Sequence, residues 1–518
     1  EKKKIYQNFS FVDYIKKTDI FYNWVIKNIN WKLYDIIGFS LNYGQFLPSL
    51  AVSKKIKDMF PKKKIIFGGS RTIGDLGVNI LNTFDYIDFI VSGEGEKALF
   101  LLTSDYKNYR SIPRLIYRDG EKIIWNKSDN VIDLNNLPFL NFDSFFNEIS
   151  LTSEEIKQYF ILYGRLPIEI SRGCWWNKCS FCSQKIIHNS YREKDIDKII
   201  SEIQFLSDRY QTLRFQLIGD TLPKKKYRIL LKKLMKLDKD FSFFVEARAG
   251  QLKSKDFNLL KKAGFDEIQI GIETFSNNYI KKINKGVNVI DNIAALKFCK
   301  ENGIKNNYNL IINYPNEEKI DFEETKKNIQ LFKQYLDPPQ ISFLNVEFGS
   351  CILSNPENYN IKKFDFTNID KLMFPNYFLK KGFNCIYKFK RKKNFCENNW
   401  KKLVKEWEKE FEKFEIDGIK KQKTIDKLVF YYVDGKNFLK IYDKRSKKSV
   451  KIYVLDSLER EIFLSCIDVI SFKEICKKFS NVSEKKILNI LKNFEKSGIV
   501  FRENKRFLSL PLKHIIIK

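Results

Sequence analysis

Three closely spaced cysteines are the residues of this chain best suited to chemistry. Cys174, Cys179 and Cys182 follow the spacing C-x4-C-x2-C. A disulfide pair would leave one thiol over, and a structural zinc would need a fourth ligand, for which His188 is the only nearby histidine. Three thiolates suit an iron–sulfur cluster in which one iron stays open for another molecule. We favour this cluster, and zinc is the alternative.

The elements around the cysteines predict a barrel. An apolar run at 166–170 precedes them and an amphipathic helix is expected at 195–210, so the trio lies on a loop at the carboxyl end of a buried strand. A helix at 254–263 is expected to begin with a serine N-cap and to end at Gly264. Six β/α units predict a partial (β/α)6 TIM-like barrel. The five further strands are expected at 213–218, 243–247, 267–271, 307–313 and 341–346.

The first 150 residues show a second α/β pattern. Strands are expected at 35–40, 64–67 and 86–91, with a helix at 46–59 after the first strand. Glycines at the strand ends allow a ligand to approach the backbone closely. The pattern predicts a Rossmann-like, doubly wound parallel sheet, followed by a β-hairpin at 114–125 with an Asp-Gly turn.

The tail is expected to form a module of its own. Three strands come first, and helices follow at 458–466, 471–479 and 483–496, the last two with serine N-caps. A short hairpin at 498–510 completes an α+β order of elements that resembles a winged helix. The expected domains are 1–150, 151–355, a helical barrel extension at 356–425, and 426–518.

Other cysteines and aromatic residues are interpreted more simply. Cys351, Cys385 and Cys396 form no C-x2-C pair, so we interpret them as ordinary thiols rather than as ligands of an auxiliary cluster. A helix at 396–414 carries an apolar stripe that is expected to pack on the barrel. Trp175 and Trp176 could shield a cluster or face a substrate, and we favour a place at a domain interface.

The cysteine trio, with Phe181 directly before its last member, resembles the signature of the radical SAM superfamily. The usual spacing there is C-x3-C-x2-C, and this chain carries one additional residue. The Arg-Gly-Cys-Trp-Trp segment at 172–176 resembles a subfamily in which a cobalamin-binding domain precedes the radical SAM domain, and whose members mature ribosomally made peptides. The Arg-Phe-Leu-Ser-Leu segment at 506–510 also recurs there. The resemblance implies a [4Fe–4S] cluster on Cys174, Cys179 and Cys182.

The same resemblance implies how the cluster and S-adenosylmethionine (SAM) meet. The open iron would bind SAM, and reductive cleavage of SAM would yield a 5′-deoxyadenosyl radical. Gly219 and Asp220 match the position that receives the SAM amino group, although Asp220 could equally cap a helix. Glu246 is expected to bind the ribose or amino group and Arg248 the carboxylate, with an internal salt bridge as the alternative. The expected contacts near the adenine are Phe181, Gly271, Glu273, Asn309 and Tyr314.

The N-terminal segment resembles the cobalamin-binding domain found before many radical SAM domains. Its usual D-x-H-x-x-G loop, whose histidine ligates cobalt, is absent, because residues 41–45 occupy that place and neither histidine of the chain lies in this segment. Cobalamin could bind without a histidine ligand from this segment, or the segment could serve only as a scaffold. The expected cobalamin contacts are Ser40, Gly68, Gly69, Gly93 and Glu94.

Composition limits the classes of function. The chain has 518 residues, 43% of them hydrophobic, and no run of 18 apolar residues, so no membrane span is expected. An oxygen-sensitive cluster and few scattered cysteines favour a cytoplasmic location. The net charge is +30, but the lysines are spread along the chain. We therefore interpret the charge as a compositional bias rather than as a nucleic-acid site.

Three functions follow from these patterns. The resemblance favours a radical SAM enzyme that modifies an unactivated carbon of a precursor peptide by methylation, crosslinking or epimerisation. The C-terminal module is then expected to bind the leader of the peptide, and a ferredoxin or flavodoxin to supply electrons. The alternatives are a cobalamin-dependent C-methyltransferase that acts on a small molecule, and a nucleic-acid-binding regulator that senses redox state.

Overall fold

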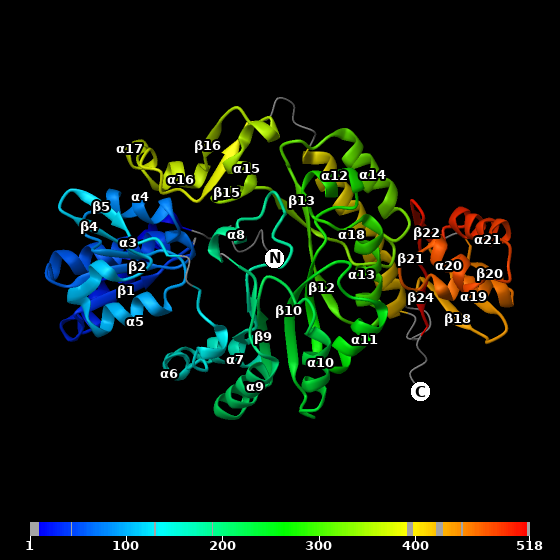
Figure 1. Ribbon diagram of the computed structural model, residues 1–518, viewed down its shortest axis with the longest axis horizontal. Coiled ribbons are helices and arrows are strands. Elements are labelled where there is room, and N and C mark those ends of the chain that lie inside the picture. The colour runs from blue at the N-terminus through cyan, green and yellow to red at the C-terminus, as the bar shows by residue number, and fades with distance from the viewer. Residues whose placement is uncertain are drawn as a thin grey trace.

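The chain folds into three main parts. They follow one another across Figure 1, with the N-terminal sheet in blue, the barrel in green and the C-terminal module in orange and red. A segment drawn in yellow arches from the barrel to the N-terminal part (Figure 1). None of the described helices is both long and apolar enough to cross a membrane. The computed structural model describes residues 10–42, 44–128, 131–188, 190–390, 397–420, 428–446 and 449–514.

The N-terminal part is a five-stranded sheet of order β1-β2-β3-β4-β5. The first three strands are parallel, whereas β4 and β5 run antiparallel to their neighbours. The expected hairpin forms at Asp119 and Gly120, and Gly120 has the left-handed φ of 62° that such a turn needs. The strands are β1 (Ile36–Ser40), β2 (Lys64–Gly68), β3 (Phe89–Val91), β4 (Leu115–Asp119) and β5 (Lys122–Trp125).

The doubly wound parallel order that we expected for this sheet is wrong. Two crossovers carry the chain from β1 to β2 and from β2 to β3, each to the next position in the same direction along the sheet, so the strand order does not reverse. The tight turn after β4 is too short for a crossover, and it makes the last pair antiparallel. The helices of this part and of the connector are α2 (Phe11–Asn28), α3 (Phe46–Met59), α4 (Asp75–Thr83), α5 (Glu96–Ser104), α6 (Asp143–Ser150) and α7 (Glu154–Tyr163).

Six parallel strand positions form the central barrel, as the sequence predicts. The sheet order is β12-β11-β10-β9-β6, and a bridge between Glu273 and Leu310 joins β11 to the β13–β14 pair. The strands are β6 (Leu166–Glu169), β9 (Arg214–Ile218), β10 (Ser242–Arg248), β11 (Phe265–Gly271), β12 (Lys305–Asn307), β13 (Asn309–Ile312) and β14 (Gln340–Phe343).

Helices cover the outside of the barrel. In α9, Ile199, Ile203 and Leu206 repeat every three to four residues and are fully buried, so one apolar face holds the helix against the strands. The helices are α9 (Ile196–Tyr210), α10 (Tyr227–Met235), α11 (Ser254–Lys262), α12 (Asn277–Lys282), α13 (Val289–Glu301) and α14 (Lys319–Ile329).

The segment after β14 joins the barrel to the N-terminal part. Phe374 and Phe383 lie with ring centroids 6.1 and 5.8 Å from that of Phe46 in α3. We expected a helical extension from residue 356, but its first half is only partly helical. It also contains two strands, β16 and β17, whose aromatic residues favour extended backbone. The elements are β15 (Val346–Glu347), α15 (Cys351–Ser354), β16 (Phe364–Phe366), α16 (Asn368–Met373), α17 (Asn376–Leu379) and β17 (Ile386–Phe389).

The second half of the extension is helical, as expected. Helix α18 (Glu397–Lys420) buries an apolar stripe against the barrel, where Trp400 packs on Phe322 and Trp407 packs on Phe275. The indole of Trp407 also donates a hydrogen bond of 2.9 Å to the backbone oxygen of Leu336. Cys396, which precedes this helix, lies outside the described residues.

The C-terminal module has the order of elements that the sequence predicts. Ser471 and Ser483 cap α20 and α21 as expected. Ser254 does not cap α11, since Lys253 is the N-cap and the Ser254 hydroxyl donates to Asp468 of this module over 2.9 Å. The elements are β18 (Phe430–Asp434), β19 (Leu439–Asp443), β20 (Lys451–Leu455), α19 (Ser457–Ser465), β21 (Ile470–Ser471), α20 (Phe472–Lys478), α21 (Glu484–Lys496), β22 (Val500–Glu503), β23 (Arg506–Ser509) and β24 (Leu512–Lys513).

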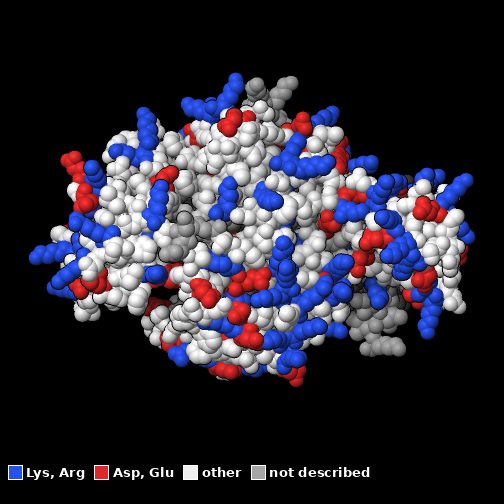
Figure 2. Space-filling view, viewed as in Figure 1, with Lys and Arg blue, Asp and Glu red and all other residues white. Residues whose placement is uncertain are grey.

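The β22–β23 hairpin of this module packs on the barrel. Glu503 accepts hydrogen bonds from the Asn277 side chain at 2.6 Å and from the Ile290 backbone at 3.2 Å. Arg506 pairs with Asp291 of α13 at 3.3 Å. In a winged helix this hairpin is the wing, and here it contacts α13. Figure 2 shows lysines and arginines spread over the visible face and mixed with acidic residues, without a single basic stripe.

Candidate active site

The three cysteines lie on a loop that projects from the carboxyl end of the first barrel strand. Two short strands, β7 (Ser171–Arg172) and β8 (Arg192–Glu193), pair antiparallel and close the base of residues 173–191, which we call the cysteine loop. Gly173 begins this loop with a φ of 77°, and a Cβ there would stand 2.9 Å from the backbone oxygen of Ser190. The short helix α8 (Gln184–Ile187) belongs to the loop and lies between the barrel and the N-terminal sheet (Figure 1).

The cysteine thiols are half-buried and influence one another. Burial, together with the neighbouring Cys179 and Cys174, raises the pKa of Cys182 to about 11. Burial likewise raises the pKa of Cys179, whereas the charges of Lys285 and Arg248 oppose that shift. Among the residues described, no three histidine, cysteine or acidic side chains already stand together as a metal-binding set. Such a set would hold a single metal ion, whereas the thiols that hold a cubane cluster each bind a different iron.

The donor set fits an iron–sulfur cluster better than zinc. Three thiols lie on one loop, and the cations of Lys285 and Arg248 are near enough to lower the pKa of Cys179. Positive charge beside thiolates suits a cluster that carries net negative charge. His188, the candidate fourth ligand for zinc, instead places its Nδ1 3.4 Å from Glu94 of the N-terminal part.

Two half-buried carboxyl groups lie at neighbouring strand ends. Gly219 follows β9, and a Cβ there would stand 2.4 Å from the Ser171 hydroxyl oxygen, so only glycine allows this close approach. Asp220 comes next, and its Oδ2 is buried without a hydrogen-bond partner. Burial raises the pKa of Asp220, and burial together with Asp220 and Glu273 raises that of Glu246. Buried acids with raised pKa values are typical of binding sites for cationic groups.

Arg248, at the end of β10, is held by the cysteine loop. Its guanidinium lies 5.1 Å from the ring centre of Trp175 and 4.9 Å from that of Trp176. It also donates a hydrogen bond to the backbone oxygen of Lys285. The structure describes both Glu246 and Arg248 and shows no ion pair between them. The two tryptophans therefore pack at the barrel mouth, rather than at the domain interface that we favoured.

A tight turn at 284–286 receives these contacts. Trp176 donates its indole N–H to the backbone oxygen of Asn284 over 2.9 Å. Gly286 has a φ of 70°, and a Cβ there would stand only 1.9 Å from Cζ2 of Trp176. The turn thus joins the cysteine loop to the carboxyl ends of the strands, and it depends on a glycine that leaves room for the indole.

Lys285 and Glu273 form a buried ion pair beside this turn. Lys285 Nζ lies 2.8 Å from Glu273 Oε1, and the lysine side chain is only 8% exposed. Burial alone would lower the pKa of Lys285, but Glu273 and Cys179 raise it above its ordinary value. Gly271 leaves space for the pair, because a Cβ there would stand 2.6 Å from Lys285 Nζ. Glu273 itself has a left-handed φ of 67°, which marks strained backbone.

The remaining expected SAM contacts lie close to the cysteine loop. Phe181 is half-buried, and Lys285 Nζ stands 5.9 Å from its ring centre. Asn309 accepts the backbone N–H of Glu273 at 3.1 Å, which ties β11 to β13. Tyr314 is buried with its hydroxyl 2.9 Å from that of Ser180 in the cysteine loop. Tyr314 thus anchors the loop by its side chain.

The N-terminal strand ends meet the cysteine loop at an interdomain cleft. A cavity of about 260 Å³ is lined by Gly69, Gly93 and Glu94 from the sheet, and by Arg172 and His188 from the loop side. A second cavity of about 230 Å³ shares Ser70 and Ile187 with the first. We call these two neighbouring cavities the interdomain cleft. Three of the five expected cobalamin contacts line it, and the lining does not include Ser40 and Gly68.

Glycines make the sheet side of the interdomain cleft possible. Gly69 has a φ of 99°, and a Cβ there would stand 2.5 Å from the backbone oxygen of Leu41. Gly93 has a φ of 91°, and its Cβ would stand 2.6 Å from a guanidinium nitrogen of Arg114. Both positions therefore exclude larger residues and keep the backbone exposed to the cleft.

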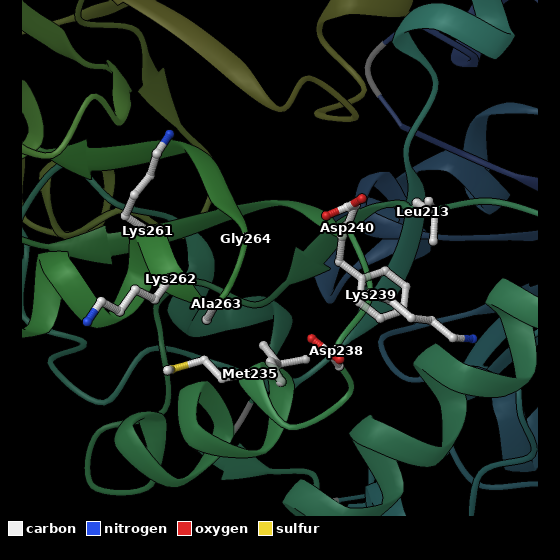
Figure 3. A pocket seen from close by; sticks show the side chains of 11 residues that line it. Leu213, Met235, Asp238, Lys239, Asp240, Lys261, Lys262, Ala263 and Gly264 are labelled. Carbon is white, nitrogen blue, oxygen red and sulfur yellow. The ribbon is translucent and has the colours of Figure 1, made fainter. Parts of the chain in front are cut away.

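A further cavity lies at the opposite end of the barrel. It has a volume of about 520 Å³ and is lined where α10 and α11 end and where β9 and β10 begin (Figure 3). Barrels carry their chemistry at the carboxyl ends of the strands, so this cavity is not the candidate site.

We interpret Cys351 and Cys385 as ordinary thiols. The Sγ of Cys351 lies 3.0 Å from Lys185 Nζ, and the Sγ of Cys385 lies 3.2 Å from Arg71 Nη1.

Sequence reasoning missed several residues of this site. Lys285 and Gly286 gave no signal in a single sequence, because a lysine followed by glycine after a short helix is common at helix ends. Arg192 was not singled out either, and Arg172 was noted only as part of the Arg-Gly-Cys-Trp-Trp segment. The role of these two arginines depends on a pairing between two short strands that are separated by 19 residues and hold the cysteines between them.

Comparison with known proteins agrees with this geometry. The model of the radical SAM superfamily matches residues 168–329, which contain the cysteine loop and most of the barrel. An uncharacterized methyltransferase from Pyrococcus horikoshii is 24% identical over 300 residues, which are 57% of this chain and 63% of the relative. The match thus spans less than two thirds of either protein.

Solved structures share the fold of nearly the whole chain. The cobalamin-dependent SAM radical enzyme OxsB, with aqua-cobalamin and SAM bound, superposes with a TM-score of 0.57 at 16% identity, covering 93% of this chain and 75% of OxsB. The radical SAM methyltransferase TsrM from Kitasatospora setae, with tryptophan and a SAM analogue, has a TM-score of 0.55 at 13% identity and covers 73% and 78% of the two chains. The matched model, together with the cysteine trio, shows that residues 168–329 form a radical SAM domain, and radical SAM enzymes use a [4Fe–4S] cluster and SAM as cofactors.

Proposed function

We propose that this chain is a cobalamin-dependent radical SAM enzyme that methylates an unactivated carbon of a small molecule. The observation that carries the proposal is the interdomain cleft, in which the glycine-rich strand ends face the cysteine loop. The methyltransferase names of two similar proteins, and the aqua-cobalamin bound to OxsB, support this reading. The tryptophan bound to TsrM favours a small substrate over the peptide that we expected.

The proposal gives each group of residues a role. Cys174, Cys179 and Cys182 hold the cluster, and bound cluster and SAM together supply a reductive route to a 5′-deoxyadenosyl radical. The half-buried carboxyls of Asp220 and Glu246 bind the amino and hydroxyl groups of SAM. Their raised pKa values fit this role, because a cationic ammonium restores the ionised form of a buried acid.

Arg248 and Lys285 have the complementary role. Both lie near Cys179, and they are the cations positioned to attract the SAM carboxylate or the charge of the cluster. The two tryptophans on Arg248 restrict its motion and exclude water from the contact. Electrons come from a reductase, for which a ferredoxin or a flavodoxin is our proposal.

Anaerobic reconstitution with iron, sulfide, SAM and a strong reductant tests the enzyme class. We expect release of 5′-deoxyadenosine, and Cys179→Ala should abolish it. Cys476→Ala is a matched control, because Cys476 is also half-buried but lies in α20 of the C-terminal module. If no 5′-deoxyadenosine forms under several reductants, the proposed chemistry is wrong.

Cobalt measurement tests the cofactor of the interdomain cleft. After incubation with hydroxocobalamin and removal of the free cofactor, we expect about one cobalt per chain. Gly69→Val should prevent binding, because even a Cβ at this position would stand 2.5 Å from a backbone oxygen beside the cleft. Gly303→Val, where nothing lies within 4 Å of a Cβ, is the control. A wild-type chain that retains no cobalt would refute the cobalamin part of the proposal.

One observation favours a peptide substrate as the second candidate. Within the part of the chain that the structure describes, strand β20 pairs with β19 alone and forms the outer edge of its sheet. Val450, Ile452 and Val454 alternate beside this edge and are 56%, 55% and 60% exposed. Natural sheets usually protect such edges with charges or coverage, and an extended peptide can add to an open one by backbone hydrogen bonds.

A binding measurement separates the two candidates. A short peptide encoded beside the gene, labelled for fluorescence anisotropy, should bind the whole protein if the edge receives a leader. Ile452→Lys should then weaken binding at least about tenfold. Lys492→Ala, at an exposed position on α21, is the control. Equal affinity of Ile452→Lys and the wild type would refute a leader site at β20.

A further inference from the structure

A single carboxylate of the N-terminal part contacts both strands at the base of the cysteine loop. Glu94 follows β3, and its side chain is only 4% exposed. It accepts hydrogen bonds from Arg192, one of them at 3.2 Å, and it pairs with Arg172 at 3.5 Å. His188 approaches the same carboxylate with its Nδ1 at 3.4 Å.

The two arginines face each other across a strand pair. In the antiparallel ladder of β7 and β8, Arg172 stands directly opposite Arg192. Like charges at opposed positions repel, and these side chains are only 9% and 15% exposed, so water screens them poorly. Arg172 has two more carboxylate partners, Glu169 and Glu96, whereas Arg192 pairs with Glu94 alone among the acidic residues that the structure describes.

The β7–β8 strand pair lies at the base of the cysteine loop. The described residues between β7 and β8 form the cysteine loop, so all three cluster cysteines lie on the chain that this two-residue ladder closes. A ladder of two pairs is too short to be stable by itself. Burial alone would raise the pKa of Glu94, but His188, Arg192 and Arg172 hold it well below its usual value. Glu94 is therefore ionised under ordinary conditions and can neutralise both arginines.

We propose that Glu94 is a positioning residue, through which the N-terminal part holds the base of the cysteine loop so that its three thiols can bind a cluster. Glu94 was expected only as a cobalamin contact, and its oxygens also contact Arg172 and Arg192 at the base of the cysteine loop and His188 within it. The inference rests on the proposed cluster site. It adds that retention of the cluster depends on a residue some 80 positions before the first cysteine, in a different part of the fold.

Glu94→Gln tests this role, because it keeps the size of the side chain and removes its charge. We expect the reconstituted variant to lose its cluster to a chelator at least about tenfold faster than the wild type, and to show an altered EPR spectrum when the reduced cluster meets SAM. Glu96→Gln is the matched control. Of the cations that the structure describes, Glu96 pairs with Arg172 alone, and its side chain is 38% exposed, so its loss should change the chelation rate less than about threefold.

The outcomes separate this inference from the proposed function. Chelation is measured without turnover, so a wild-type chain that keeps its cluster but releases no 5′-deoxyadenosine refutes the enzyme activity and leaves the role of Glu94 testable. A Glu94→Gln variant with wild-type iron content, chelation rate and EPR spectrum overturns the inference. Should this variant fail to fold, Arg192→Gln tests the same contact from the loop, where faster cluster loss supports the inference and unchanged loss overturns it.

Discussion

Replacing Gly286 with alanine should dislodge the cysteine loop from the barrel. The new Cβ would stand 1.9 Å from Cζ2 and 2.1 Å from Cη2 of Trp176, so the indole has to leave its place. The left-handed φ of 70° adds about 1–2 kcal/mol for any residue with a Cβ. Displacement of Trp176 also sacrifices its hydrogen bond to Asn284, worth about 1 kcal/mol, and its contact with Arg248, worth about 0.5–2 kcal/mol.

Gly303→Ala isolates the steric part of this cost. Gly303 has a φ of 59° and nothing within 4 Å of a Cβ, so its substitution carries only the backbone penalty. The difference between the two variants is then about 1.5–3 kcal/mol, which is more than tenfold in an equilibrium constant. Because Trp176 lies between two cluster ligands, this free-energy difference should weaken the binding of the cluster and of SAM. We expect weaker SAM binding and a lower iron content in Gly286→Ala.

Isothermal titration with SAM and iron analysis on both reconstituted variants provide the assay. Circular dichroism checks that each variant remains folded. If Gly286→Ala and Gly303→Ala have the same SAM affinity and the same iron content, then Trp176 does not hold the cysteine loop, and the role assigned to the 284–286 turn is wrong.

Three further predictions concern charge at the same site. Lys285→Met should weaken SAM binding by about tenfold or more, because it leaves Glu273 as an unpaired buried charge. Lys285→Arg should retain part of the affinity. Equal SAM titration curves for Lys285→Met and the wild type would contradict this prediction. SAM binding should weaken as the pH falls from 7 to 5, because the pKa values of Asp220 and Glu246 are raised and these carboxyls gain protons at a higher pH than ordinary ones. Glu246→Gln should make SAM affinity depend less on pH. A variant with the same dependence of affinity on pH as the wild type would count against the assignment. Cluster assembly, followed by absorbance, should be faster at pH 9 than at pH 7. The pKa of Cys182 is raised to about 11, and this thiol must lose its proton to bind iron. An assembly rate that does not depend on pH would argue against thiol deprotonation as the limiting step.

Local patterns were sufficient for the elements and for the positions of the expected site residues. The alternation of apolar strands and amphipathic helices located the six strand positions of the barrel, because side chains buried on a parallel sheet leave a clear signal in the chain. Residues such as Asp220, Glu246 and Glu273 were recognised because they directly follow or end such strands. The spacing of the cysteines was visible without any structure.

Long-range pairing was beyond the reach of such patterns. The strand order of the N-terminal sheet depends on the direction of each crossover, which the sequence of a strand does not record. The contact of Phe374 and Phe383 with Phe46 links residues more than 300 positions apart, and a local pattern registers only that all three are apolar. The strands in the first half of the 356–425 segment were missed for the same reason.

The sequence by itself determined that three thiols stand on one loop after a buried strand, because spacing and periodicity are properties of the chain alone. Only the tertiary structure decided what surrounds that loop. Arg172 and Arg192 become neighbours when β7 pairs with β8, and Glu94 reaches them when two separately folded parts meet. Charges that are unremarkable along an extended chain acquire a function when burial removes water from between them, since an ion pair is strong only where the solvent cannot compete.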